Sequence, residues 1–301
     1  MKKNQNKQKI LVCGGTGFIG KRVVKKLLER GKKVNLLVYD KISVSLKNEN
    51  IKIFKGDLSD KKTIVKAVKS SDIVLNLVGT FNEDIFYLLN IVSSANLLDA
   101  CKEAKNIKKI IFVSSEAVYG NYKGRPHNEN DKPEPATEYG FSKYLAEETY
   151  KFYSKRYKIP VIILRLANTY GPGHRIGVIS ECLDSILHKR PVRIHKDGRQ
   201  KRDFLYVDDA AEGIVKSLVC KTDGVSVFNI TGQKAYSLID TLKIIERIIG
   251  KKIKINFLPK KKQDIKIMQA DFSKAKKYFG YSPKINLEEG IVRTIDYYKK
   301  A

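Results

Sequence analysis

The sequence lacks any apolar run that approaches the ~20 residues needed to span a bilayer. Its basic N-terminus leads into a short apolar strand and not into the longer apolar core of a secretory signal. The four cysteines are scattered without a CxxC pair, so we expect reduced core thiols and no disulfide framework. The four histidines show no ligand spacing, and we expect no metal. These absences predict a cytoplasmic protein without a membrane partner.

Acidic residues are also scarce, because 32 Asp and Glu stand against 59 Lys and Arg, for a formal net charge of +27. Most lysines are spread along the whole chain, which favours a general compositional bias as the source of the positive charge. Two other interpretations stay open: attraction of a polyanionic small substrate, and nucleic-acid binding. The clusters at 2–9, 251–254 and 260–262 lack the interleaved aromatic residues of a base-stacking surface, so a nucleic-acid partner is not favoured.

The most informative segment that is present is rich in glycine. Gly14, Gly17 and Gly20, in the run GGTGFIG, follow an apolar strand at 10–13 and open an amphipathic helix. Such glycines allow a tight turn, close approach of backbone N–H groups to a pyrophosphate, and close packing of the helix on the sheet. The helix N-terminus adds partial positive charge and free N–H donors. We therefore predict a nucleotide cofactor here, with a purely structural turn as the alternative.

Strand and helix patterns alternate along the first half of the chain. Strands are expected at 10–13, 34–38, 51–54, 73–78, 109–113 and 161–165, and helices at 18–30, 60–69, 88–104 and 140–157. After residue 170 the rhythm changes, with a strand expected at 228–230 and helices from Asp208 and after a capping Ser237.

This pattern predicts an α/β fold, a Rossmann-type doubly wound parallel sheet with a smaller C-terminal substrate-binding subdomain. Residues 1–170 with 203–230 are expected to form the dinucleotide-binding domain. Residues 171–202 with 231–301 are expected to form the substrate-binding subdomain.

Two groups of polar residues have the chemistry to act on a hydroxyl. Tyr139 and Lys143 stand four apart at the start of a helix, and so share one face of it. A tyrosine with its ordinary pKa near ~10 is a poor base, but a neighbouring ammonium and an oxidised nicotinamide favour the phenolate. Ser115 follows a predicted strand, at the sheet edge where ligands bind. Taken alone, each group also fits an ordinary surface helix or strand end.

With these motifs in order, the chain resembles the extended short-chain dehydrogenase/reductase family, and within it the NAD-dependent epimerase/dehydratase branch typified by UDP-glucose 4-epimerase. The resemblance runs from about residue 10 to residue 298. It is carried by GGTGFIG (14–20), GDL (56–58), SSEAVYG (114–120), YGFSK (139–143), LRLANTYGPG (164–173), RDFLYVDD (202–209) and DFSKAK (271–276).

The resemblance implies roles at the matching positions. Tyr139 would take the proton of a sugar hydroxyl, Lys143 would bind the nicotinamide ribose and lower the pKa of Tyr139, and Ser115 would hold the reacting oxygen. Glu116, Asn168 and Arg202 would bind the substrate, the last two at its nucleotide-diphosphate, which suits the fork of an arginine. The implied cofactor-binding residues are Gly14, Gly17, Phe18, Ile19, Gly20, Asp40, Asp57, Leu58, Leu77, Val78, Gly79, Asn90, Tyr139 and Lys143, with Asp57 and Leu58 at the adenine.

The chain departs from the family pattern at three places. Val38 stands where NAD-binding members carry the ribose-binding Asp, and Asp40 comes two residues later. No arginine follows that could bind the 2′-phosphate of NADP, so we expect NAD as the cofactor, with NADP as the open alternative. The segment 77–90, which normally helps to form the sugar site, looks shortened. Glu116 is followed by Ala117, which disfavours the acid–base pair that the 4,6-dehydratases need.

The sequence therefore predicts a nucleotide-sugar 4-epimerase that acts through a transient 4-keto intermediate with a bound nicotinamide cofactor. One alternative is an NAD(P)H-dependent reductase of a 4-keto nucleotide sugar. A non-catalytic RNA-binding relative is the other, and the joint presence of Ser115, Tyr139 and Lys143 counts against it. The family also implies a homodimer through the helices near 88–104 and 139–157. The identity of the sugar and of the nucleotide stays open.

Overall fold

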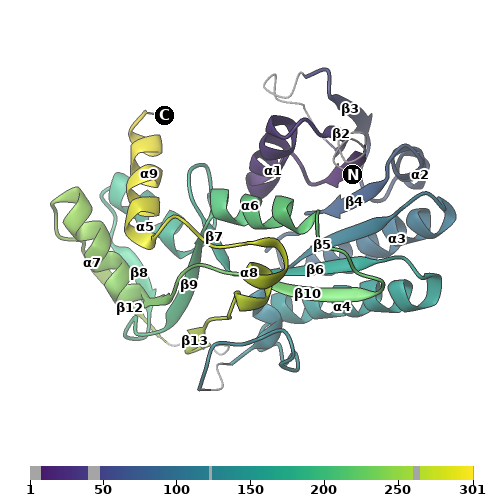
Figure 1. Cartoon of the computed structure of the whole chain (residues 1–301). Helices are drawn as coiled ribbons and strands as arrows, with labels where there is room; N and C mark the ends of the chain where they lie inside the picture. The colour runs from purple at the N-terminus through teal and green to yellow at the C-terminus, as the bar shows by residue number, and fades with distance from the viewer. Residues whose placement is uncertain (1–7, 40–47, 122–123, 260–264, 301) are drawn as a thin grey trace.

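Seven parallel strands form the main sheet of the protein, in the order β10-β6-β5-β4-β1-β2-β3 (Figure 1). The structure is a computed structural model that describes residues 8–39, 48–121, 124–259 and 265–300. The strands of this sheet are β1 (Lys9–Cys13), β2 (Lys33–Val38), β3 (Ile51–Lys55), β4 (Ile73–Asn76), β5 (Lys109–Ser115), β6 (Val161–Leu166) and β10 (Val225–Ile230). The order reverses between β1 and β4, which creates the crevice where doubly wound folds bind their ligands.

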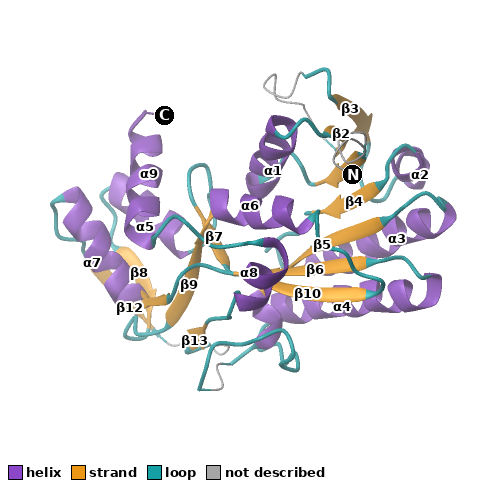
Figure 2. Ribbon diagram, in the orientation of Figure 1, coloured by secondary structure: helices purple, strands orange, loops and turns teal. Residues whose placement is uncertain are grey.

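Helices cover both faces of this sheet (Figure 2). Each face has its own apolar core, because the strands are buried on both sides and their side chains alternate between the two. One face packs against α1 (Phe18–Glu29), α6 (Val207–Ser217) and α8 (Ser273–Phe279). The other packs against α2 (Lys61–Lys69), α3 (Ser93–Glu103) and α4 (Glu138–Tyr157). The predicted fold class, a doubly wound parallel sheet, is confirmed.

Several predicted elements differ at their ends, and two of these differences lie beside the candidate site. Strand β4 stops at Asn76 and does not continue to residue 78, because the Asn76 side chain turns the chain there. Its Oδ1 accepts a bond from the N–H of Val78 at 3.0 Å, and its Nδ2 donates to the hydroxyl of Tyr150 at 2.8 Å. The helix expected at 88–104 begins as a π-helical turn, η3 (Leu88–Val92), before α3 takes over.

The C-terminal part builds smaller sheets beside the main one. Strand β9 (Lys201–Tyr206) pairs with β7 (Asn168–Tyr170), β11 (Ala235–Ser237) and β13 (Ile267–Met268), while β8 (Val192–His195) pairs with β12 (Ile255–Leu258). A third apolar core lies between these strands and the helices α5 (Val178–Leu187), α7 (Leu238–Ile249) and α9 (Leu287–Lys300). The predicted cap of α7 is confirmed, since the Ser237 hydroxyl accepts a bond from the N–H of Asp240 at 3.0 Å.

Four lysines adopt the left-handed backbone conformation, which residues other than glycine, asparagine and aspartate seldom adopt. Lys158 ends α4 with a φ of +58°. Lys105, Lys189 and Lys196 have φ values of 42°, 55° and 58°. Within the described ranges, every residue with positive φ that is not glycine is a lysine.

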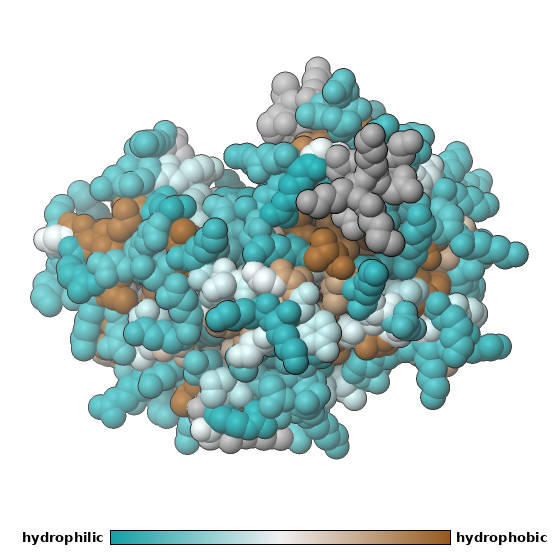
Figure 3. Space-filling model, viewed as in Figure 1, coloured by the Kyte–Doolittle hydropathy of each residue, from teal (hydrophilic) through white to brown (hydrophobic). Residues whose placement is uncertain are grey.

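The face of the molecule seen in Figure 1 is mostly hydrophilic, with its hydrophobic residues gathered in small patches (Figure 3). Of the helices in the described part of the chain, none is long and apolar enough to cross a membrane.

Candidate functional site

A cavity of about 440 Å³ lies where the segments after β1, β4, β5 and β6 meet. These are the carboxyl ends of neighbouring parallel strands, so the cavity opens at the sheet edge that the topology predicts. Segments of the C-terminal part, from β9, from α5 and from β13, complete its wall. Eight of the predicted site residues line it: Phe18, Ile19, Leu77, Gly79, Ser115, Tyr139, Lys143 and Asn168.

The glycine loop contributes Phe18 and Ile19 to the lining of this cavity. Gly14 has a φ of +79°, and a Cβ there would come within 3.1 Å of the backbone of Leu77. A Cβ on Gly20 would overlap the carbonyl oxygen of Gly14, so only glycine lets α1 start this close to the turn. A Cβ on Gly17 would meet only the Gly14 carbonyl oxygen, at 3.3 Å, and would otherwise project into open space.

The N-terminus of α1 is left free to bind an anion. Its cap residue, Gly17, has no side chain to accept a hydrogen bond, and the first turn contains no acidic residue. The N–H groups at the start of a helix need a partner, and together with the helix dipole they attract a negative group. A phosphate is such a partner.

Tyr139 and Ser115 line the same cavity. Ser115 ends β5, and its Oγ caps the 3₁₀ turn η4 (Glu116–Tyr119) by accepting a bond from the N–H of Ala117 at 3.2 Å. Tyr139 is in the first turn of α4, which Thr137 caps by accepting from the N–H of Gly140 at 3.0 Å. Burial raises the pKa of Tyr139 to about 12, and a hydrogen bond with Ser115 acts in the opposite direction.

Lys143 lies one turn further along α4 and is buried. Its Nζ donates to the carbonyl oxygen of Val113 at 3.2 Å, and burial lowers its pKa to about 8. A Cβ on Gly79 would come within 2.7 Å of this Nζ, so the ammonium packs directly on the glycine. Asn90 is adjacent, since the same Cβ would be 3.3 Å from its Oδ1. That oxygen has no partner among the described residues, while the Asn90 Nδ2 donates to the hydroxyl of Ser142 at 2.9 Å.

A buried ion pair holds α4 against the sheet behind these residues. Arg165 of β6 donates from Nε and Nη2 to the two carboxylate oxygens of Glu147, at 2.9 and 2.6 Å. The hydroxyl of Ser114 donates to the same carboxylate at 2.7 Å. Because Glu147 follows Lys143 by one turn and Ser114 precedes Ser115, this pair fixes both of the elements that carry the reactive side chains.

Glu116 does not line the cavity, and its side chain is 2% exposed. Its Oε1 accepts a bond from Asn168 Nδ2 at 2.8 Å, and its Oε2 has no partner in the described part of the chain. Burial, and then the nearby charge of Asp203, raise the pKa of Glu116 well above its ordinary value, while Arg202 acts in the opposite direction. Asp203 is also buried, which raises its pKa to about 7. Glu116 can therefore affect a bound molecule only through its neighbours, above all Asn168.

The remaining predicted residues that the structure describes do not line the cavity. Asp57 and Leu58 follow β3, and Asp57 already accepts bonds from the backbone and side chain of Ser59, at 2.7 and 2.6 Å. Arg202 donates to the carbonyl oxygen of Ile265 at 2.8 Å. Val78 packs in the core beneath α2 and α3. Asp40 lies outside the described residues.

Four aromatic side chains that line the cavity, Phe81, Tyr170, His174 and Phe204, are not among the predicted site residues, and two of them pack on residues that are. The ring of Phe81 packs on Tyr139 with centroids 4.4 Å apart, and His174 stacks on Phe18 at 4.2 Å. Phe81 belongs to the segment that the sequence marked as shortened. His174 directly follows the turn Gly171-Pro172-Gly173. These two irregular segments were the only features of the sequence that could have pointed to Phe81 and His174.

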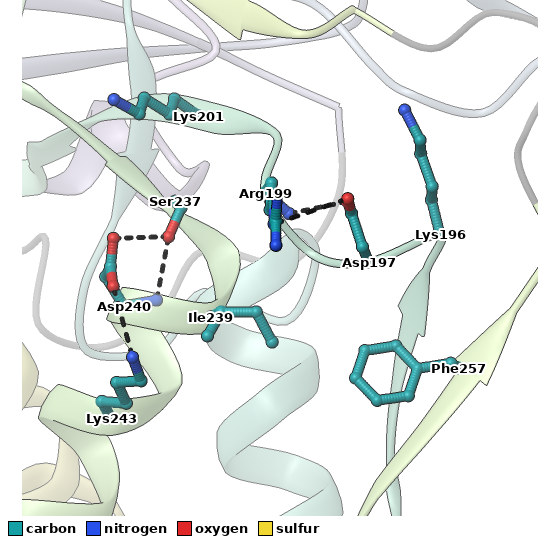
Figure 4. A pocket seen from close by; sticks show the side chains of 9 residues that line it. All are labelled: Lys196, Asp197, Arg199, Lys201, Ser237, Ile239, Asp240, Lys243 and Phe257. Carbon is teal, nitrogen blue, oxygen red and sulfur yellow. Dashed lines mark hydrogen bonds and ion pairs between the residues drawn. The ribbon is translucent and has the colours of Figure 1, made fainter.

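Figure 4 shows a second hollow, of about 810 Å³, in the C-terminal part of the chain. Six of its nine lining residues are charged, and the pair between Arg199 and Asp197 is a long one, at 3.7 Å. Its wall also includes Ser237 and Asp240, which bond to each other at the start of α7. None of the predicted site residues that the structure describes contributes to its wall, so the cavity at the sheet edge is the candidate site.

Comparisons with known proteins identify the family of the chain. Residues 10–231 match the model of the NAD dependent epimerase/dehydratase family. A UDP-glucuronate 4-epimerase of Thermodesulfobacterium geofontis is 33% identical over 313 residues, which cover 96% of each chain.

Two solved structures resemble the whole chain. A Bacillus cereus UDP-glucuronic acid 4-epimerase, in complex with UDP-glucuronic acid and NAD, aligns with a TM-score of 0.89 and 30% identity. The Thermotoga maritima UDP-glucose 4-epimerase with UDP-glucose aligns with a TM-score of 0.88 and 30% identity. Both alignments cover 97% of this chain and 99% of the other.

Proposed function

The chain belongs to the NAD dependent epimerase/dehydratase family, and we propose that it is a nucleotide-sugar 4-epimerase with NAD as its bound cofactor. One observation carries this proposal. Ser115, Tyr139 and Lys143 line a single cavity together with Phe18 and Ile19 of the glycine loop. A hydroxyl group and a dinucleotide can therefore meet in one place.

The residues present fit NAD. The uncapped start of α1 and the open space beside Gly17 suit the pyrophosphate, and Gly79 leaves backbone close to Lys143. Asp57 and Leu58 follow β3, the second strand from β1 in the sheet, and are assigned to the adenine. Lys143 is assigned to the nicotinamide ribose. When bound, NAD supplies a reversible hydride acceptor for the sugar carbon.

Tyr139 is assigned as the group that takes the proton of the C4 hydroxyl and returns it after the sugar has turned over. Ser115 is assigned to the oxygen that reacts, because it lies beside Tyr139 and carries a neutral donor. With a pKa raised to about 12 by burial, Tyr139 needs positive charge nearby to act as a base. The ammonium of Lys143, one helical turn away, is one source of that charge, and an oxidised nicotinamide is the other.

Asn168 and Arg202 are assigned to the diphosphate of the substrate, and Glu116 is a positioning residue for Asn168. The bond from Asn168 Nδ2 to Glu116 fixes the plane of the amide, which is itself exposed to the cavity. Ala117 lines the cavity where a 4,6-dehydratase would need an ionisable side chain. This supports epimerisation over dehydration.

The test separates an epimerase from a reductase by the fate of the cofactor. We expect the purified protein to retain NAD, detected by mass spectrometry after denaturation. We also expect it to convert UDP-glucose or UDP-glucuronate to the 4-epimer, followed by proton NMR, without net change in NADH absorbance. The Tyr139→Phe protein is the control for a contaminating epimerase. Stoichiometric consumption of added NADH or NADPH by a protein purified without cofactor would instead identify a reductase.

The assembly we propose is a homodimer formed through η3, α3 and α4. Leu88 and Val92 are 55% and 49% exposed on one segment, and Phe141 and Phe152 are 44% and 62% exposed on α4. Phe141 and Phe152 are three helical turns apart and so share a face. Light scattering after size exclusion should give twice the chain mass, and Phe152→Asp should reduce it. A monomeric wild-type protein would refute the dimer.

Two coarser features complete the proposal. All four cysteines are buried and unpaired, which supports a reducing, cytoplasmic compartment. The proposed domain division is the one that the sequence predicts. Residues 1–170 and 203–230 bind the dinucleotide, and residues 171–202 and 231–301 bind the sugar nucleotide.

A further inference from the structure

An aromatic stack joins the glycine loop to the C-terminal part of the chain. The rings of Phe18 and His174 lie 4.2 Å apart between centroids and are inclined by only 16°. Phe18 is the first residue of α1, at the helix end that suits a phosphate. Both rings line the candidate cavity.

Arg22 reinforces this contact from the next turn of α1. Its Nη1 donates to the carbonyl oxygen of Phe18 at 3.1 Å, and its Nη2 donates to that of Pro172 at 2.6 Å. Its guanidinium also lies 5.1 Å from the centre of the Phe18 ring. The start of α1 is therefore tied to the turn that precedes His174 by a charged group as well as by the stack.

The far end of the chain anchors His174. The hydroxyl of Tyr298, in α9, donates to the carbonyl oxygen of His174 at 2.8 Å. Burial and the charge of Arg22 lower the pKa of His174 to about 4, so its ring is neutral when it stacks at physiological pH. The neutral His174 ring thus adds an apolar surface beside the N-terminus of α1. It does not add a positive charge to that of Arg22.

We propose that the Phe18–His174 stack is a latch that keeps the dinucleotide in the glycine loop between turnovers. This inference depends on the proposed function only for the identity of the retained molecule. An enzyme that uses the same NAD in every cycle gains from slow release, whereas a reductase must exchange its cofactor. His174 acts through Phe18 and the loop, and is a positioning residue.

The test measures cofactor exchange, not turnover. NAD-loaded protein is mixed with isotopically labelled NAD, and the label retained after rapid desalting is followed by mass spectrometry. His174→Ala should release NAD about threefold to tenfold faster, the factor that an aromatic pair is typically worth. His174→Phe restores a ring and should exchange slowly. The matched control is His188→Ala, because His188 is an exposed histidine at the end of α5.

A second variant covers the case in which His174→Ala folds poorly, as judged by its melting temperature. Tyr298→Phe removes only the hydroxyl that anchors His174, and should also speed exchange. The latch is refuted if the folded His174→Ala and Tyr298→Phe proteins release NAD at the wild-type rate, or if His174→Phe releases it as fast as His174→Ala. Slow exchange in the wild type and fast exchange in His174→Ala, without any epimerisation, would overturn the proposed function and leave the latch standing.

Discussion

Replacing Glu147 by glutamine should destabilise the protein far more than any surface charge change. The carboxylate is fully buried and accepts two bonds from Arg165 and one from Ser114. Glutamine keeps the shape but removes the charge, and its amide group meets donors where the carboxylate offered an acceptor. Arg165, 1% exposed, would then be a buried cation without a counter-charge.

The expected cost follows from that unpaired charge. Removing one partner of a buried ion pair typically costs about 3–5 kcal/mol in the free energy of unfolding. For a chain of this size, each kcal/mol lowers Tm by roughly 2 °C, so we expect a decrease of about 6–10 °C. The neighbouring Glu148 provides the control, because its exposed pair with Lys151 should contribute less than ~1 kcal/mol.

Urea unfolding followed by circular dichroism would measure both variants, and a Glu147→Met/Arg165→Met double variant completes the design. The double variant leaves no unpaired charge, so it should recover most of the loss. A cost below ~1 kcal/mol for Glu147→Gln would refute this reasoning, since Arg165 would then be paired or hydrated in some other way. A double variant as unstable as the single one would show that packing, not charge, is what Glu147 contributes.

Four further predictions concern the cavity. Tyr139→Phe should lower turnover by ~10²-fold or more, with NAD content unchanged, and near-wild-type rates on a confirmed substrate would remove Tyr139 from its role. Gly17→Val should abolish NAD binding in calorimetry, because its side chain would fill the open space beside the loop; full affinity in a folded variant would make the loop structural. Lys143→Met should weaken NAD binding and move the rising limb of the pH–rate profile to higher pH, because the phenolate loses a nearby cation; an unmoved limb would confine Lys143 to the ribose. Lys143→Met should also stabilise the NAD-free protein at pH 7, since burial holds the pKa of Lys143 near 8, below its ordinary 10.5, and this cost is fully present below pH 8. Equal urea midpoints at pH 7 would contradict that assignment.

The parts of the fold that the sequence predicted are those set by local rules. The glycine turn, the start of α1 and the run of buried strands each follow from neighbouring residues, and the structure confirms them. The small sheets after residue 170 were missed, because strands such as β13 are short and depend on distant partners.

The same limit applies to the site. The spacing of Tyr139 and Lys143 is a property of one helix and could be read from the sequence. The contacts of Phe81 with Tyr139 and of His174 with Phe18 join separate segments, and no local pattern encodes them. The inward orientation of Glu116 was likewise hidden, because it follows from the 3₁₀ turn that Ser115 caps.

The lysines with left-handed backbone bear on the meaning of the charge excess. A side chain in this conformation costs roughly 1–2 kcal/mol where glycine would cost none. Lysine stands at four such positions, including the end of α4, so it has entered sites where the backbone disfavours it. A selective pressure for one cationic surface has no reason to fill the segments after three helices and the turn between β8 and β9 in this way. Lysines at these four positions are what a charge excess spread over the whole sequence would produce, and each of them carries a local conformational cost.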